Sequence, residues 1–175
     1  LEHDPDSPVV LTYLGTCEMR SDPRRAAERF RRAIELRPAF EGPYIRLCEL
    51  LHQTRQPAGV RSVAEEGLRR TEDSDGQLHF FRALGTFTLG GDPASAIADL
   101  EVTLARAAQP GPAFRLRAAV RLRLLDDPEG ALEDLERFAL WAGREEAEWL
   151  RRDPSFAPLA GDPRFERLVD RLARG

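Results

Sequence analysis

The amino-acid sequence predicts an all-α protein, an α-solenoid built from stacked antiparallel helix pairs. One observation is an Asp-Pro or Gln-Pro step that recurs at spacings of 34, 36 and 35 positions, at Asp22-Pro23, Gln56-Pro57, Asp92-Pro93 and Asp127-Pro128. Another is that apolar residues on both sides of each step follow helical spacing. A repeat of this length cannot bury its apolar face alone, so its units are expected to stack on one another.

Each step is predicted to start the second helix of a pair. An aspartate side chain accepts hydrogen bonds from the unpaired amides of a first helical turn, and proline suits the next position because no backbone donor is needed there. Positions four, eight and eleven residues after the cap lie on one helix face. They hold Ala26, Val60, Ala96 and Ala131, then Phe30, Ala64, Leu100 and Leu135, and then Ala33, Gly67, Thr103 and Phe138. The small residues at the first position predict a close approach of two helices.

A matching stripe lies on the first helix of each pair, at positions twelve, nine, eight and five residues before the cap. These positions hold Tyr44, Phe80 and Arg115, then Leu47, Ala83 and Ala118, then Cys48, Leu84 and Ala119, and then Leu51, Phe87 and Leu122. Arg115 interrupts an otherwise apolar pattern. Agreement in register across the units argues against an ordinary helical bundle with accidental periodicity.

The repeated unit resembles the tetratricopeptide repeat (TPR) family. The first unit carries the matching residues Leu11, Leu14-Gly15, Ser21-Asp22, Ala26, Phe30, Ala33 and Glu35-Leu36-Arg37-Pro38, with one residue missing between Gly15 and Asp22. The third unit adds Gly91-Asp92-Pro93 and Ala96-Ile97, whereas Gly67 and Arg115 match poorly. The resemblance covers residues 8–141. It implies a right-handed superhelix whose concave face binds protein segments.

The expected organisation is four TPR-like helix pairs, at about 8–40, 41–73, 74–109 and 110–141, followed by a capping segment at 142–175. Residues 1–7 look like the tail of a truncated preceding repeat, which implies further protein upstream. In the capping segment, Asp162-Pro163 is predicted to start a last helix whose apolar face carries Phe165, Leu168, Val169 and Leu172. This ending resembles the closing part of bacterial TPR arrays, some of which follow a kinase, cyclase or sensor domain.

The composition argues against several classes of function. The net charge of −4 disfavours a nucleic-acid groove, which needs many cations. No apolar run is long enough to span a membrane, and a cytoplasmic protein is expected. Cys17 and Cys48 are predicted to be small buried residues without a disulfide. No phosphate-binding loop, nucleophile elbow or metal-ligand spacing occurs, so we expect no enzyme, cofactor or metal site in this chain.

The predicted binding site is the concave groove along the first helices. Arginines recur ten positions before the caps, beside an apolar residue, and the stripe also includes positions seven before the caps. The predicted groove residues are Tyr13, Ile45, Arg46, Glu49, Phe81, Arg82, Leu116, Arg117 and Val120. Arginine binds carboxylates in a bidentate manner, so the expected ligand is a peptide with acidic groups and an apolar anchor. In an arginine-rich chain the same alignment is also compatible with a solvated face.

Three functions follow from these patterns. The leading one is a protein-interaction module that binds a partner peptide or protein segment in the groove, as a regulatory or scaffolding part of a larger protein. The second is a scaffold that self-associates. The third is a ligand-sensing domain attached to an upstream kinase or cyclase, for which a closed pocket would be expected instead of an open groove.

Overall fold

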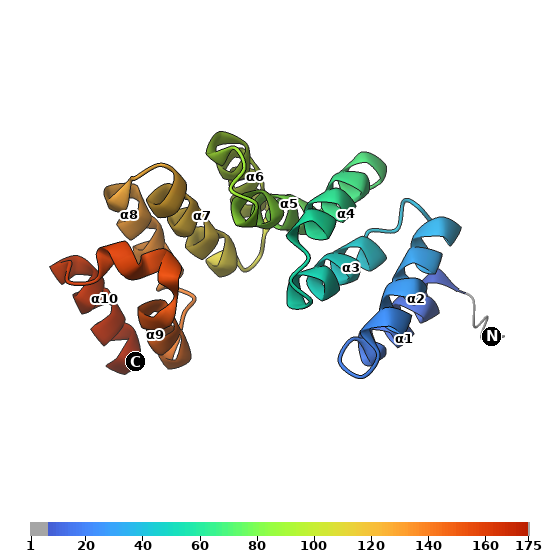
Figure 1. Cartoon of the computed structure of the whole chain (residues 1–175), viewed down its shortest axis with the longest axis horizontal. Helices are drawn as coiled ribbons and strands as arrows, with labels where there is room; N and C mark the ends of the chain where they lie inside the picture. Colours follow the sequence, from blue (N-terminus) through green and yellow to red (C-terminus); the bar gives the residue numbers. More distant parts are fainter. Residues whose placement is uncertain (1–6, 175) are drawn as a thin grey trace. The chain divides into compact units, whose positions relative to one another are not determined.

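The computed structural model describes residues 7–174, and in this part of the chain all regular structure is helical (Figure 1). The chain forms two compact units, residues 1–89 and 90–175. The boundary between them falls inside the third expected helix pair, between α5 and α6. The expected tail of a preceding repeat at residues 1–7 lies, except for Ser7, outside the described residues.

The first unit contains five helices within its described residues, drawn from blue to green in Figure 1. They are α1 (Pro8–Glu18), α2 (Pro23–Leu36), α3 (Gly42–Gln53), α4 (Pro57–Arg70) and α5 (Gln77–Thr88). Each helix packs against the next, and α3 also contacts α1 and α5. The first helices α1, α3 and α5 therefore form one layer, with α2 and α4 packed behind them.

The second unit contains α6 (Pro93–Arg106), α7 (Gly111–Leu124), α8 (Pro128–Phe138), α9 (Arg144–Arg152), the 3₁₀ helix η1 (Pro154–Leu159) and α10 (Pro163–Arg174). Helix α7 packs against α6, α8 and η1, and α10 packs against α9 and α8. Phe156, Leu159 and the predicted apolar face of α10 are buried in this packing. The last three helical segments thus share one apolar core with α7 and α8.

The Pro residues of the four recurring steps begin α2, α4, α6 and α8, as the sequence predicts. Asp22, Asp92 and Asp127 each accept a backbone hydrogen bond in the first turn, with the Asp92 carboxylate 2.9 Å from the Ser95 nitrogen. Gln56 makes no such bond, and its side-chain amide donates instead to the Thr54 hydroxyl at 2.9 Å. Aspartate is the better cap because its short carboxylate reaches the turn amides.

Burial confirms the predicted register of the second helices. The four small residues at the first stripe position, and the four at the second, are buried almost completely: Ala26, Val60, Ala96, Ala131, Phe30, Ala64, Leu100 and Leu135. Gly67, a poor match to the family pattern, is also buried. A Cβ at position 67 would lie 2.8 Å from a Leu78 methyl and 3.2 Å from the Tyr44 ring. Glycine there lets α4 approach both neighbouring helices.

The expectation of two buried cysteines is half right. Cys48 is buried against α4, and burial raises the pKa of its thiol well above the usual value. Cys17, near the end of α1, is exposed. Both are free thiols. Within the described residues, no helix combines the length and the apolar character that crossing a bilayer requires.

Candidate interaction surfaces

Four of the predicted groove residues of the first unit belong to the layer formed by α1, α3 and α5 and are not buried. Tyr13 on α1 is 69% exposed, unusual for an aromatic side chain inside a helix. On α3, the Arg46 guanidinium donates to both carboxylate oxygens of Glu49, at 2.7 and 3.0 Å. Arg82 on α5 is half-buried. We call Tyr13, Arg46, Glu49 and Arg82 the first-helix face.

Two other predicted residues of this unit lie inside the helix packing. Ile45 and Phe81 are buried, and the Phe81 ring packs edge-to-face on Phe80 with the ring centroids 5.5 Å apart. Neither side chain offers a substantial area to solvent. The aromatic group available to a ligand on this face is Tyr13.

In the second unit the predicted residues serve a different purpose. Leu116 and Val120 on α7 are buried. Arg117 Nε and Nη2 donate to the Asp134 carboxylate of α8 at 2.9 and 2.6 Å. Arg121 reaches the same carboxylate at 3.1 Å and donates to the Gly130 carbonyl at 2.8 Å. Because Asp134 is only 1% exposed, these arginines neutralise a buried charge that would otherwise be costly.

Asp134 was not foreseen from the sequence, although a signal was present. It lies seven residues after its cap, and Asp99 occupies the same position after the preceding cap. The equivalent residue in the first pair is Arg29, which pairs with Glu18 at 2.6 Å. In the first and fourth pairs, the charged residue at this position forms an ion pair with the first helix of its own pair.

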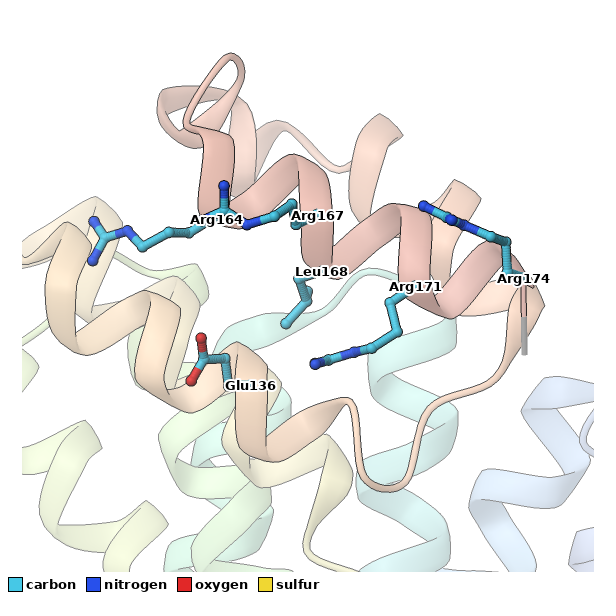
Figure 2. Close-up of a pocket in the computed structure, with 6 residues that line it drawn as sticks. All are labelled: Glu136, Arg164, Arg167, Leu168, Arg171 and Arg174. Atoms are coloured by element: carbon cyan, nitrogen blue, oxygen red, sulfur yellow. The ribbon is translucent and has the colours of Figure 1, made fainter.

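A second surface lies between α8 and α10 (Figure 2). Arg164, Arg167, Arg171 and Arg174 follow one another at spacings of three, four and three along α10 and line a hollow of about 500 Å³ together with Leu168 and Glu136. Figure 2 shows Arg171 extending beneath the helix on the side of Leu168 and Glu136. Four cations on one helix stripe repel one another unless anions lie nearby.

Of these arginines, Arg164 is paired with nearby carboxylates. It donates to both oxygens of Glu129, at 2.6 and 2.7 Å, and these bonds raise its pKa while lowering the pKa of Glu129. Within residues 7–174, neither Arg167 nor Arg171 forms an ion pair. Arg171 and Arg174 also lie in the last helical turn, where cations complement the helix dipole. The hollow is therefore a cationic surface with charge available for a partner.

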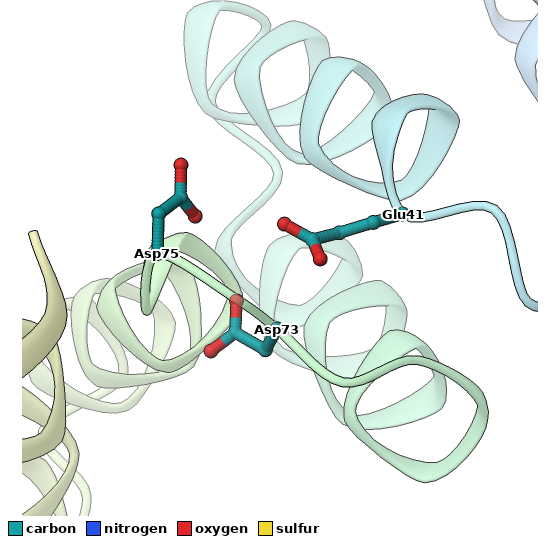
Figure 3. A group of neighbouring side chains, drawn as sticks. All are labelled: Glu41, Asp73 and Asp75. Atoms are coloured by element: carbon teal, nitrogen blue, oxygen red, sulfur yellow. The ribbon is translucent and has the colours of Figure 1, made fainter.

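Three carboxylates meet near the start of α5 (Figure 3). The nearest oxygens of Glu41, Asp73 and Asp75 lie within 4.8 Å of one another. Each accepts local hydrogen bonds: Glu41 from the Ser74 amide at 3.1 Å, Asp75 from Gln77 Nε2 at 2.5 Å, and Asp73 from the Leu78 amide at 2.8 Å. These bonds account for the cluster as the anchor of the α4–α5 loop and of the first turn of α5.

The buried Asp73 also binds the Nδ1 atom of His79. The six-residue separation in sequence crosses a loop, so helical spacing could not reveal this pair. The Asp73 carboxylate further accepts from the His79 backbone amide at 3.4 Å. The pair therefore tethers the first turn of α5 to the preceding loop.

Comparisons with known proteins bear on the fold. No protein-family model matches this sequence, and no curated protein matches it. Among solved structures, MamA superposes with a TM-score of 0.69 at 12% identity, covering 93% of this chain and 86% of MamA. A chain of the APC/C hetero-tetramer Cut9-Hcn1 gives a TM-score of 0.75 at 12% identity, covering 98% of this chain and 33% of that one.

A third structure carries the repeat in its own description. TTC0263, a thermophilic TPR protein of Thermus thermophilus, superposes with a TM-score of 0.65 at 22% identity. The match covers 86% of this chain and 82% of TTC0263. These likenesses agree with the helix pairs, the Asp-Pro caps and the buried small residues described above. This chain has the tetratricopeptide-repeat fold.

Proposed function

We propose that this chain is a protein-interaction module and that it binds a partner peptide through the first-helix face of its first unit. The observation that carries the proposal is the exposed Tyr13 on the same helix layer as Arg46, whose side chain is exposed. Tyrosine and arginine are the residue types enriched at energetically important interface positions. The repeat fold supports an interaction or scaffolding role, and no catalytic role is proposed.

The partner chemistry follows from the accessible groups. Tyr13 supplies an aromatic surface for an apolar anchor, whereas Arg46 favours carboxylates. The Arg46–Glu49 pair is exposed, so releasing Arg46 to a partner costs only about 0–1 kcal/mol. The predicted ligand is thus an acidic peptide with one apolar residue. Its anchor is assigned to Tyr13 instead of Phe81 because Phe81 is buried.

The arginine hollow on α10 is a competing site for the same kind of partner. Arg167 and Arg171 are exposed and would attract acidic segments without an aromatic anchor. A binding experiment must therefore separate the two surfaces by mutation.

The test is selection of random dodecamer peptides displayed on phage against the full chain, followed by titration of the enriched peptides. We expect enriched sequences with acidic residues and one apolar residue. Tyr13→Ala and Arg46→Glu should each weaken binding at least about 10-fold. Arg32→Glu is the matched control, because Arg32 is an exposed arginine of α2 that also forms a short-range pair, with Glu35.

Two outcomes would contradict the proposal. Peptides that lose affinity only in Arg167→Glu/Arg171→Glu would place the partner on α10. If the enriched peptides bind the variants of the first-helix face, of Arg32 and of α10 equally well, the first-helix face is a solvated surface that does not bind them.

Self-association is a second candidate function, favoured by one observation. Leu140 and Trp141, after the end of α8, are both exposed large apolar residues. Such neighbours often mark contact surfaces. Light scattering over a concentration series tests this role. If the patch joins two copies, Leu140→Ser should lower the average mass relative to the wild type. If the wild type stays monomeric at every concentration, self-association is excluded.

A further inference from the structure

Arg115 stands at a position of the repeat where the second and third pairs have aromatic residues. Its counterparts are Tyr44, which is fully buried on α3, and Phe80 on α5. In the second unit, the Arg115 guanidinium carbon lies 4.2 Å from the centre of the Trp149 ring and 6.0 Å from that of Phe138. The cation therefore replaces an aromatic side chain and stacks between aromatic groups of α8 and α9.

This cation lacks a close anion. Among residues 7–174, no carboxylate oxygen lies within 4.0 Å of its nitrogens, and no described group accepts a hydrogen bond from it. Burial lowers the pKa of Arg115, while Asp153 and Glu146 act on it only through longer-range attraction. Both carboxylates are occupied as caps, by the Ser155 amide and the Gly143 amide, each at 2.8 Å.

The contrast with Arg117 two residues later is informative. Arg117 donates two hydrogen bonds to Asp134, whereas the donors of Arg115 find no acceptor among the described residues. A half-buried guanidinium without acceptors is unfavourable, because its donors have lost part of their hydration. A guanidinium that stacks on an aromatic ring keeps its N–H donors in its own plane, so the contact with Trp149 does not use them up.

A hollow of about 340 Å³ opens beside this group. Pro112, Phe138 and Trp141 supply apolar walls, and Arg115, Glu146 and Gln109 supply polar ones. Trp141 is 53% exposed, so the aromatic wall is open to an incoming molecule. The volume lies at the lower end of the range for small-molecule sites. All these residues belong to the second unit, so the hollow is independent of the first-helix face.

We propose that this hollow binds a small organic carboxylate with an aromatic or branched aliphatic body. The carboxylate would accept two hydrogen bonds from Arg115, and the apolar body would pack on Pro112, Phe138 and Trp141. A bidentate contact of this kind satisfies the unused donors of Arg115. Glu146 lines the same hollow and opposes a second negative charge, so the site favours monocarboxylates over dicarboxylates.

The chain reports on this site through its own fluorescence. Its two tryptophans are Trp141 and Trp149, and both border Arg115 or the hollow. Titration of the full chain with phenylacetate should give a saturable change in emission. Phenylacetamide, which has the same shape without the charge, should bind at least about 10-fold more weakly. The dicarboxylate 1,4-phenylenediacetate, which adds a second carboxylate to the same aromatic body, should also bind more weakly than phenylacetate.

Variants identify the group that recognises the charge. Arg115→Gln should weaken phenylacetate binding at least about 10-fold, whereas Glu146→Gln should strengthen it about 3-fold because a nearby negative charge is removed. Arg123→Gln is the matched control, since Arg123 is an exposed arginine of the same helix. It should bind phenylacetate like the wild type.

The variant Arg115→Leu separates a binding role of Arg115 from a purely structural one. Under the proposal, this variant should lose phenylacetate binding while its melting temperature stays the same or rises, because an apolar residue replaces a half-buried charge that forms no ion pair within residues 7–174. A purely structural role would instead lower the melting temperature. A large fall in melting temperature together with no phenylacetate binding by the wild type up to 10 mM (about −2.7 kcal/mol, the weak limit) would overturn the proposal. Equal affinities for phenylacetate and phenylacetamide would overturn it as well.

Discussion

Arg46 in the first unit and Arg117 in the second occupy the same position of the repeat, ten residues before the cap, yet they differ in environment. The Arg46 side chain is 45% exposed and pairs with a neighbour on its own helix. The Arg117 side chain is 14% exposed and pairs with the buried Asp134 of the next helix. Register alone therefore does not decide whether a repeat position faces a ligand or joins two helices. The partner on the adjacent helix decides it.

The variant Arg117→Ala gives the most stringent test of this difference between Arg46 and Arg117. The substitution leaves the buried Asp134 with Arg121 alone, so the free energy of unfolding should fall by about 3 kcal/mol. Urea denaturation followed by circular dichroism measures it. The paired variant Arg117→Ala/Asp134→Ala removes the buried charge as well and should recover part of the loss. A loss below about 1 kcal/mol in the single variant would mean that Arg121 suffices.

At a repeat position that serves only helix packing, the same substitution should have a similar effect on stability in both units. Ala26 in α2 and Ala131 in α8 are both completely buried at the small position of the stripe. Ala26→Leu and Ala131→Leu should each lower the free energy of unfolding by about 1–3 kcal/mol, because the added methyl groups force neighbouring helices apart. The same denaturation curves test this. Free tolerance of leucine at either position would contradict the close approach there.

Glu41 offers a pH test within the first unit. Burial and the nearby Asp73 and Asp75 raise the pKa of Glu41, while the Ser74 amide bond opposes the shift. A carboxyl with a raised folded-state pKa binds its proton more tightly in the folded state, so it costs stability as pH rises from its unfolded pKa through its folded pKa. Glu41→Gln should therefore raise stability at neutral pH by less than about 1 kcal/mol. On going from pH 4 to pH 7.5, the melting temperature should change more favourably in this variant than in the wild type, because the penalty of ionising Glu41 is absent. An equal change in the two proteins would contradict the assignment.

The smallest effect is expected at Arg46. Because its pair with Glu49 is exposed and spans three residues of one helix, Arg46→Ala should change the free energy of unfolding by only about 0.2–0.5 kcal/mol. Denaturation in low and high salt checks this, since screening should remove most of the difference. A loss as large as that of Arg117→Ala would erase the distinction between the two arginines.

Much of the fold could be predicted from residues that lie close together in the sequence. The four Pro residues after the caps begin helices, and the small and large stripe positions are buried as their spacing predicts. These features depend on local chemistry: a side chain that binds turn amides, a ring that sets φ, and a period that gathers apolar groups on one face. Gly67 shows the limit, because its reason for being glycine lies in Leu78 and Tyr44 on neighbouring helices.

The candidate surfaces were less predictable. Sequence spacing selects the first-helix positions, but it assigned Phe81 and Val120 to a groove, and the structure buries both. The arginine spacing along α10 is readable in the sequence, whereas the hollow it lines needs Glu136 and Leu168 in place. Arg115 appeared as an exception to an apolar stripe. Its stacking on Trp149 joins residues of two helices whose contact no local pattern encodes.

The sequence by itself determined the helix pairs, their caps and the apolar stripes, because each of these depends on residues within about one helical length of one another. Only the tertiary structure decided which charged residues are buried in pairs, as Arg117 is with Asp134, and which form no ion pair within residues 7–174, as is the case for Arg115. The physical reason is that desolvation and pairing depend on what the neighbouring helix places opposite each charge. That arrangement exists only once the helices have packed.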